Sequence, residues 1–164
     1  MSRAGSCSRV RRASLDDATT ITSLNADVQA LHADALPWRF KPPASETLSH
    51  SEIARLMSIS AVTFFIADLD DDPAGYLLAE VCRRPETART YAYDFLHVHH
   101  ISVRPSRRNQ GVGRALMDAA VALAREQCID RLALDVWQFN SRAQAFFARY
   151  GLETYNQQMW MTVE

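Results

Sequence analysis

Two closely spaced glycines constrain this chain more than any other feature of its sequence. Gly111 and Gly113 lie two residues apart, although the whole chain of 164 residues has only five glycines. A glycine is used where a Cβ cannot be tolerated, so each one is informative in a glycine-poor chain. The preceding residues predict a long strand from Tyr91 to Val103, and the following ones a helix from about Gly111 to Gln127. The sequence therefore predicts a strand–loop–helix unit with a glycine-rich entry to the helix.

The rest of the chain alternates between strand and helix patterns. Apolar residues at helical spacing and turn residues between them predict an α/β fold in the order β-α-α-β-β-β-α-β-α-β. We expect a mixed central sheet of about six to seven strands with four helices. Besides the unit above, the predicted strands are 8–13, 61–67, 76–82, 131–136 and 155–163, and the predicted helices are 14–36, 45–58 and 141–150. Residues 68–75 are dense in turn formers and predict a hairpin turn that Gly75 closes.

Composition indicates one globular domain. The chain is 48% hydrophobic and 23% charged with a net charge of −1, which excludes a disordered polymer and gives no general attraction to nucleic acid. We expect a loose tail over residues 1–7 and a single domain over 8–164. The longest apolar run, Ala61 to Ala67, falls far short of the roughly 20 residues that span a bilayer, so no membrane association is expected.

The cysteines and the first residues indicate a reducing compartment. Cys7, Cys82 and Cys128 are odd in number and form no CxxC pair, so neither a disulfide framework nor a cysteine-rich zinc site is predicted. The basic residues at the start are followed by no apolar segment, so no signal peptide is expected. A cytoplasmic protein is the resulting expectation.

The loop from Arg104 to Arg114 has the composition of an anion site. The first turn of a helix presents unpaired N–H groups, and glycines allow an anion to approach the backbone. Arg107, Arg108 and Arg114 add cationic donors. The loop is neither a Walker P-loop nor a dinucleotide fingerprint, because no Gly-Lys-Ser/Thr follows and no third glycine is suitably spaced. A capped turn with solvated arginines is the alternative interpretation.

Two motifs carry a resemblance to a known family. The run Arg108-Asn109-Gln110-Gly111-Val112-Gly113 resembles the Arg/Gln-x-x-Gly-x-Gly/Ala motif of the GNAT acetyltransferase superfamily. Downstream, residues 140–152, which begin with Asn140 and include Phe146, Phe147 and Gly151, are similar to the family's second signature. The resemblance covers most of residues 8–163. It implies an acetyl-CoA-dependent N-acetyltransferase that moves the acetyl group to a primary amine by direct attack in a ternary complex.

The resemblance also implies which residues hold the cofactor. In the family, the strands matching 94–103 and 131–136 splay apart, and pantetheine enters the gap. The amides from Gln110 to Arg114 would hold the pyrophosphate, and the backbone N–H of Val103 is the candidate donor to the thioester oxygen. The full expected set is Ile101, Ser102, Val103, Arg107, Arg108, Asn109, Gln110, Gly111, Val112, Gly113, Arg114, Asn140 and Phe147.

Histidines on the long strand are the candidate bases. The spacing His97-x-His99 resembles the paired histidines of arylalkylamine N-acetyltransferases, so His99 is the first candidate, His97 the second and Glu80 on the adjacent strand the runner-up. By alternation His97, His99, Ile101 and Val103 share one face of the strand unless a bulge intervenes. Partly buried histidines satisfied by their neighbours are the alternative. No metal is predicted, since no cysteine or carboxylate cluster accompanies them.

The general acid departs from the family pattern. The family commonly places a Tyr four residues before the helix-ending glycine, and that position is Phe147 here. Phenylalanine has no proton to donate, so Tyr150 is a weaker candidate, with a packing role as its alternative. Water could instead protonate the leaving thiolate.

The acceptor is expected among aromatic residues. The resemblance implies that the segment with His32, Trp38 and Phe40 lines the acceptor side, and with Trp137 these are the predicted substrate-binding residues. Phe139 and Trp160 are further aromatics, and an apolar aromatic pocket suits a small-molecule amine or a peptide. Core packing or dimer contacts are the alternative, and a homodimer is a further expectation. A non-catalytic acyl-CoA sensor is the alternative function, suggested by Phe147. A nucleic-acid binder built on the arginines is disfavoured by the net charge.

Overall fold

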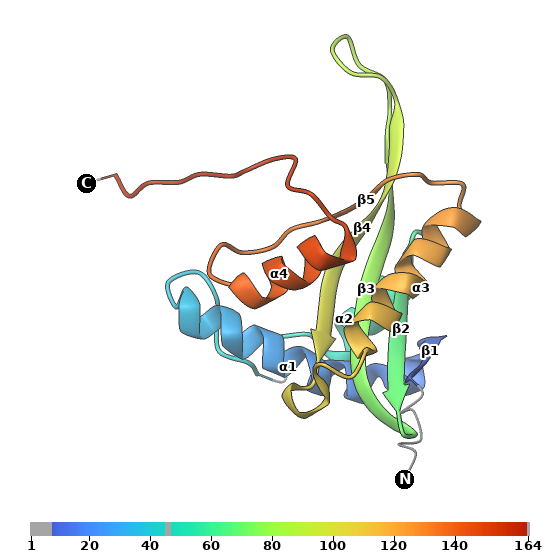
Figure 1. Cartoon of the computed structure of the whole chain (residues 1–164), viewed down its shortest axis with the longest axis vertical. Coiled ribbons are helices and arrows are strands. Elements are labelled where there is room, and N and C mark those ends of the chain that lie inside the picture. Colours follow the sequence, from blue (N-terminus) through green and yellow to red (C-terminus); the bar gives the residue numbers. More distant parts are fainter. Residues whose placement is uncertain (1–7, 45–46, 164) are drawn as a thin grey trace.

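A mixed sheet forms the centre of the computed structural model, which describes residues 8–44 and 47–163 (Figure 1). Its five strands lie in chain order, and each pairs antiparallel with the next, except that the fourth and fifth are parallel. The strands are β1 (Ser8–Arg12), β2 (Val62–Leu69), β3 (Asp72–Arg84), β4 (Tyr93–Val103) and β5 (Leu132–Leu134).

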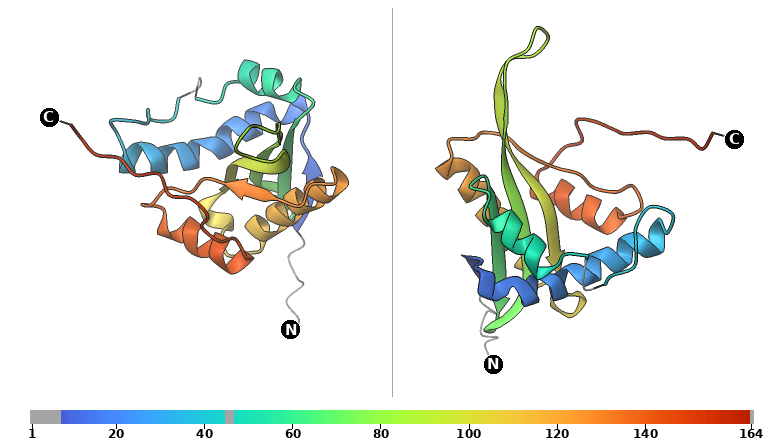
Figure 2. Two further views of the ribbon diagram at one scale, coloured as in Figure 1. Left: turned by 90° about the horizontal axis from the view of Figure 1, so that it is seen from above. Right: turned by 180° about the vertical axis from the view of Figure 1, so that it is seen from behind.

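Helices cover both faces of the sheet and give the fold three layers (Figures 1 and 2). One face carries α1 (Ala18–Ala35) and α2 (His50–Met57), and the other carries α3 (Val112–Glu126) and α4 (Ser141–Tyr150). Short 3₁₀ turns span Leu15–Asp17 and Pro105–Arg107. Each face has its own core, with Ile21, Ile53 and Tyr76 under α1 and α2, and Leu77, Leu116 and Met117 under α3 and α4. Each fully buried aliphatic side chain of this size contributes about 1.5–3 kcal/mol.

Local signals set the helix ends. The Ser49 side chain accepts a hydrogen bond from the Glu52 amide at the start of α2, which begins at His50 rather than at Ser45 as predicted. Residues 45–46 lie outside the described part, as does the predicted tail over 1–7. Gly151, with φ of 113°, ends α4 as the sequence indicated. Among the described residues, four α-helices form, in the predicted order.

The predicted role of Gly75 is wrong. The hairpin reverses at Asp70 and Asp71, both with positive φ, so β3 already begins at Asp72. Gly75 lies inside β3 opposite Val103 of β4. A Cβ built on Gly75 would lie 2.6 Å from the backbone oxygen of Ser102, so this glycine permits a close approach of two strands.

The predicted final strand, Tyr155–Val163, is also wrong for this chain alone. Residues 152–163 form neither helix nor strand, and the sheet of the described residues has five strands instead of six to seven. A strand forms only beside a partner that completes its backbone hydrogen bonds. In the described residues the sheet ends at β5, with no further strand beside it.

One extra residue in β4 decides which side chains share a face. The register of β3 with β4 runs Leu78 with His100 and then Ala79 with Val98, so His99 has no partner and forms a bulge. Leu96 and Val98 face α3 before the bulge, whereas Ile101 and Val103 face it afterwards. The alternation over residues 97–103 is therefore interrupted, and His97 lies on the opposite face from Ile101 and Val103.

Among residues 8–44 and 47–163, no helix combines the length and the apolar character that crossing a bilayer requires.

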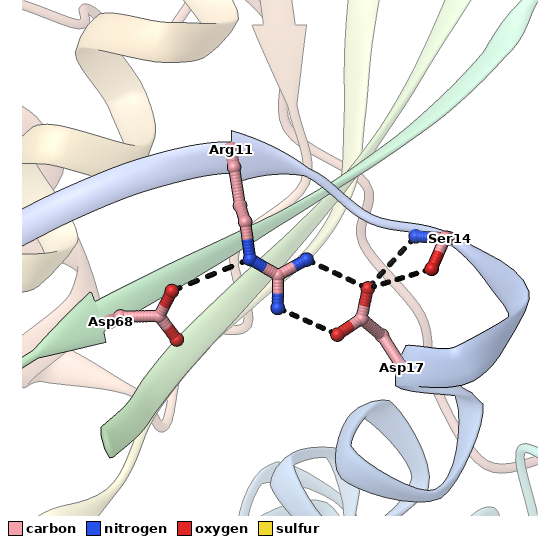
Figure 3. A network of polar contacts seen from close by, with 4 residues as sticks. All are labelled: Arg11, Ser14, Asp17 and Asp68. Atoms are coloured by element: carbon pink, nitrogen blue, oxygen red, sulfur yellow. Dashed lines mark hydrogen bonds and ion pairs between the residues drawn. The ribbon is translucent and has the colours of Figure 1, made fainter. Parts of the chain in front are cut away.

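An ion pair ties β1 to the turn that begins α1 (Figure 3). Arg11 donates to both carboxylate oxygens of Asp17 at 2.7 and 2.8 Å, and its Nε lies 3.4 Å from Asp68 on β2. The Ser14 amide also donates to Asp17 at 2.8 Å. The hydrogen bonds from Arg11 are the main cause that lowers the pKa of Asp17. This network fixes the direction in which the chain leaves the sheet and enters α1.

Replacing Asp17 should destabilise the fold and change its acid sensitivity. We expect Asp17→Asn to lower the free energy of unfolding by about 2 kcal/mol, because charge-assisted hydrogen bonds are lost. Since the pKa of Asp17 is lower in the folded chain, the network stabilises the protein above about pH 4 and this contribution disappears as the pH falls through the folded pKa. Urea unfolding at pH 7 and at pH 3 measures both effects. The exposed neighbour provides the control, Asp16→Asn. Equal stability of Asp17→Asn and Asp16→Asn at pH 7 would contradict a stabilising role for the Asp17 network.

Candidate active site

A gap opens where β4 continues beyond the end of β5. The two strands pair only over Leu96–Val98 and Leu132–Leu134. Further along, the Arg104 amide donates to Ala74 on β3. Because backbone groups alternate in direction along an antiparallel strand, the amides of Ile101 and Val103 point away from β3, toward the gap. The strand thus presents two N–H groups where β5 no longer pairs with it.

The loop that follows β4 turns backbone amides outward. Asn109 and Gly111 both have positive φ, 61° and 85°, and such turns gather N–H groups into a concave anion site. Gly111 is the N-cap of α3, and the amides of the first turn have no acceptor within the helix. The Arg108 Nε donates to the Val103 carbonyl at 3.0 Å, and the Gln110 side chain donates to the Ser106 carbonyl at 3.1 Å. The loop is therefore held against the end of β4.

The other arginines of the loop have partners in this structure. Arg107 lies 3.6 Å from Asp70 and 3.4 Å from Asp72 in the β2–β3 turn. The Arg114 guanidinium lies over the Tyr150 ring at 5.6 Å. Val112 is buried, so its side chain packs in the core and only its backbone amide is available to bind an anion. Ser102 is also buried and donates to the Leu24 carbonyl of α1 at 2.7 Å.

The second signature packs α4 against the loop. The Asn140 side-chain oxygen accepts from the Ala143 amide at 3.1 Å and caps α4. Phe147 is buried in the core under α3 and α4. A Cβ on Gly113 would lie 3.3 Å from the Phe146 ring, so this glycine brings α3 close to α4. The two signatures are thus in direct contact.

Two histidines of β4, His97 and His99, lie side by side, each near a carboxylate. His99 Nε2 lies 2.7 Å from Glu80 of β3, and the His97 ring lies 4.5 Å from the His99 ring. Because an ionised carboxylate only accepts, Nε2–H of His99 donates to Glu80 and its Nδ1 is left as the basic nitrogen. Partial burial, followed by the charge of His99, lowers the pKa of His97, whose Nε2 lies 3.6 Å from Asp135.

Sequence reasoning missed a third histidine, His100. Its Nδ1 lies 3.0 Å from the Tyr76 hydroxyl, which accepts from the Asn25 side chain of α1 at 2.8 Å. Burial lowers the pKa of His100 to about 4 and raises that of Tyr76. His100 is therefore neutral at pH 7 and shares a hydrogen bond with the Tyr76 hydroxyl. Three closely spaced histidines on one strand gave no sign of which one would be buried, because the bulge decides it.

Three of the four predicted acceptor residues lie together. The His32 ring stacks on Phe40 at 5.0 Å and meets Trp137 at 6.3 Å, and Phe139 completes the group at 5.7 Å from His32. Burial lowers the pKa of His32, which is close enough to His100 to lower the pKa of that residue by repulsion. This aromatic cluster therefore adjoins the face of β4 that carries His100.

Trp38 and Arg39, which precede Phe40 in the chain, make separate contacts with aromatic rings. Trp38, the fourth predicted acceptor residue, lies apart from the aromatic cluster and packs on Trp160 at 5.1 Å. Arg39, which sequence reasoning did not assign, lies 4.9 Å from the Trp137 ring centre. A cation over an aromatic face is a favourable contact, and the sequence does not show that Arg39 and Trp137 meet.

The Tyr150 hydroxyl has a carboxylate partner. It donates to Asp118 of α3 at 2.7 Å, and burial together with this carboxylate raises the pKa of Tyr150 to about 12. The phenol therefore stays protonated at neutral pH. Across residues 8–44 and 47–163, no group of three or more histidine, cysteine or acidic side chains could hold a metal ion.

Comparison with known families identifies the class of this fold and site. The family model described as "Acetyltransferase (GNAT) family" matches residues 26–152, well over half of the chain. The chain belongs to this family.

Individual relatives agree with this class. An uncharacterised N-acetyltransferase in the pepI 3′ region of Lactobacillus delbrueckii subsp. lactis is 25% identical over 118 residues, which are 71% of this chain. The match spans 66% of that relative's length. Among solved structures, a tetramutant of the BH1408 protein from Bacillus halodurans has a TM-score of 0.90 at 21% identity, covering 94% of this chain and 99% of the other. The aminoglycoside N-acetyltransferase AAC(6′)-Iy in complex with CoA has a TM-score of 0.75 at 18% identity, covering 99% of each chain. These two likenesses show the same fold.

The buried histidine should make stability depend on pH. The pKa of His100 is about 4 in the folded chain, below its ordinary value of about 6.5, so the unfolded chain takes up the proton first. We expect the free energy of unfolding to decline as the pH falls from about 6.5 toward 4, and His100→Gln to reduce this decline. An NMR titration of the ring, with urea unfolding at pH 7.5 and 5, measures both. His50→Gln, at an exposed histidine of α2, should keep the wild-type slope. Titration of His100 near pH 6.5 would refute the burial argument.

Proposed function

We propose that this protein transfers the acetyl group of acetyl-CoA to a primary amine by direct attack in a ternary complex. The observation that carries the proposal is the junction at the end of β4, where the outward amides of Ile101 and Val103 lead directly into the glycine loop at the start of α3. An acyl thioester on a long diphosphate arm needs both features, a donor for the thioester oxygen and a cradle for the pyrophosphate.

The cofactor would run from the loop along β4. First-turn amides of α3 and the guanidinium groups of Arg107, Arg108 and Arg114 would hold the pyrophosphate, and pantetheine would lie beside Ile101–Val103. The Asn140 amide nitrogen remains available for the arm, since its oxygen caps α4. Arg107 would exchange its aspartate partners for phosphate oxygens.

Two amides are candidates for the oxyanion donor. Val103 N–H is the one that the sequence indicated, and Ile101 N–H faces the same gap two residues nearer to His99. Negative charge develops on the thioester oxygen as the amine attacks, so an aligned N–H lowers the barrier without any rearrangement. The backbone of β4 would thus serve both in binding and in catalysis.

His99 would remove the proton of the attacking amine through Nδ1, directly or through water. Glu80 is a positioning residue in this proposal, because its hydrogen bond fixes the tautomer of His99 and stabilises the imidazolium that forms. His97 is the second candidate base. Its pKa is lowered by burial, so it is neutral at pH 7 and can relay a proton.

The leaving thiolate would take its proton from water. Tyr150 is the only acid candidate that the sequence offered, and its hydroxyl is engaged by Asp118 with a raised pKa. A CoA thiolate is a tolerable leaving group, so a dedicated acid is not required. Phe147 at the usual Tyr position fits this arrangement.

The acceptor would be a small-molecule amine with an apolar or aromatic body, bound against the aromatic cluster of His32, Phe40, Trp137 and Phe139. AAC(6′)-Iy has been solved with CoA and with a bisubstrate analogue, so the same fold accommodates a small amine in another protein. A peptide acceptor is the second candidate. Cytoplasmic acetyl-CoA would supply the acyl group.

Acetyl-CoA binding gives the first test of the function. We expect acetyl-CoA to raise the melting temperature, and a panel of aromatic and aliphatic amines to release free CoA thiol. Arg108→Ala should weaken acetyl-CoA binding at least tenfold, while the exposed Arg142→Ala should leave it unchanged. Absence of any shift at millimolar acetyl-CoA would overturn the proposal. A shift without turnover on any amine would instead support a non-catalytic acyl-CoA sensor.

The proton path gives a separate test. His99→Gln should lower kcat/KM by about 10²–10⁴ and remove the acidic limb of its pH profile, because general-base catalysis contributes on that scale. Glu80→Gln should lower kcat and shift that limb. Tyr150→Phe should change kcat less than about threefold if no acid is needed. The exposed His50→Gln is the matched control. If the pH profile of kcat/KM keeps its acidic limb in His99→Gln, His99 is excluded as the base.

A further inference from the structure

Arg39 lies beside the aromatic cluster, and no carboxylate of the described residues pairs with it. Its guanidinium carbon is 4.9 Å from the centre of the Trp137 ring and 5.8 Å from that of the Phe40 ring. The residue is exposed, and in the part of the chain that the structure describes its side chain donates no hydrogen bond. A solvated cation is therefore free to bind an anion beside the rings where the acceptor would lie.

Hydrogen bonds hold the loop that carries this arginine against α1. The amides of Arg39 and Phe40 both donate to the Leu36 carbonyl, at 2.9 and 3.0 Å. Two residues further on, the Gln29 side chain of α1 donates to the Lys41 carbonyl at 2.6 Å. The turn is thus closed on both sides of Arg39, so its side chain leaves from a fixed backbone.

The loop between β5 and α4, which carries the facing ring, is held in a similar way. The Trp137 carbonyl accepts from the Asn140 amide at 2.9 Å and from the Gln144 side chain of α4 at 3.1 Å. The Gln144 side chain also donates to the Gln138 carbonyl at 2.8 Å. The two loops meet where the Phe40 ring packs edge-on against Trp137, with ring centres 5.3 Å apart (Figure 1). The cation and the rings therefore form one preorganised surface.

A guanidinium that lies over a ring face keeps its N–H donors for a ligand, because those donors point outward in the guanidinium plane. Two of them match the two oxygens of a carboxylate, and such charge-assisted pairs are roughly twice as strong as neutral hydrogen bonds. The ring contact also limits the side-chain freedom that binding would remove. This surface therefore suits a carboxylate attached to an aromatic or apolar body, with the body on the rings and the anion on Arg39.

The same cluster reaches the histidines of β4. His32, one of its rings, is close enough to His100 for their charges to repel, and His100 directly follows the proposed base, His99. The aromatic cluster thus extends from these histidines to Arg39. An acceptor lying along it would have its amine at the histidine end and an anionic group at the arginine end.

We propose that the acceptor is a primary amine whose aromatic or apolar body carries a carboxylate, and that Arg39 binds this carboxylate. The inference rests on the proposed acetyl transfer, since it names the kind of acceptor that the same site takes. Arg39 determines specificity and takes no part in proton transfer or in cleavage of the thioester. An acceptor with several amino groups is disfavoured, because it would place more positive charge beside Arg39.

Paired acceptors test the contact during turnover. The compound para-(aminoethyl)benzoate and its methyl ester share the ring and the amine and differ in the charge at the far end. The wild-type protein should acetylate the acid with a kcat/KM at least tenfold above that of the ester, mainly through a lower KM. Arg39→Gln should abolish this preference and change the ester by less than about threefold. The control, Arg9→Gln, alters an exposed arginine of β1 at the other edge of the sheet and should keep the preference.

A binding measurement keeps the test independent of acetyl transfer. Calorimetry in the presence of CoA compares para-ethylbenzoate with para-ethylbenzamide, neither of which has an amine to acetylate. The wild-type protein should bind the acid at least tenfold more tightly than the amide, and Arg39→Gln should lose this difference. Equal or absent binding of the two, or an equal loss of both in Arg39→Gln, would overturn the inference, because Arg39 would then only pack on Trp137. Failure of the acetyl-transfer proposal would instead leave the binding difference intact without turnover of acid or ester.

Discussion

The bulge at His99 is the constraint on which the site depends. One unpaired residue in β4 reverses the alternation, so even-numbered apolar residues face α3 before it and odd-numbered apolar residues face α3 after it. The same reversal turns the amides of Ile101 and Val103 toward the gap beside β5. Without it, the side chains of residues 101 and 103 would face α1, and those amides would be bound in the ladder to β3.

The face under α1 combines packing with polar contacts that the site needs. Asn25, Tyr76 and His100 form a continuous buried chain of hydrogen bonds between α1 and the middle of the sheet. Burial lowers the pKa of His100, so the ring at the end of this chain is neutral at pH 7. The helix that carries His32 is thereby held at a fixed height above β4, which sets the position of the aromatic cluster relative to the histidines.

Sequence reasoning predicted the parts of the fold that local chemistry determines. The glycine loop, the start of α4 at Ser141 and its end at Gly151 were predictable because each depends on one backbone conformation and its immediate neighbours. The face of His100, Ile101 and Val103 relative to His97 was not predictable, since a single bulge reverses it and leaves no composition signal. The strand expected over 155–163 was wrong for one chain because strand formation depends on a partner, which alternation alone does not supply.

Gly75 has a consequence for how this protein tolerates change. It lies opposite Val103, and any side chain there would meet the Ser102 backbone at 2.6 Å. Backbone atoms cannot move aside as a flexible side chain can. A substitution would therefore displace β4, the strand that carries the outward amides. A mutational scan scored by activity would then rank Gly75 with the residues that touch substrate. Loss of activity on substitution of Gly75 would reflect the close spacing of β3 and β4 and not a contact with substrate. A parallel measurement of the amount of folded protein distinguishes these two causes.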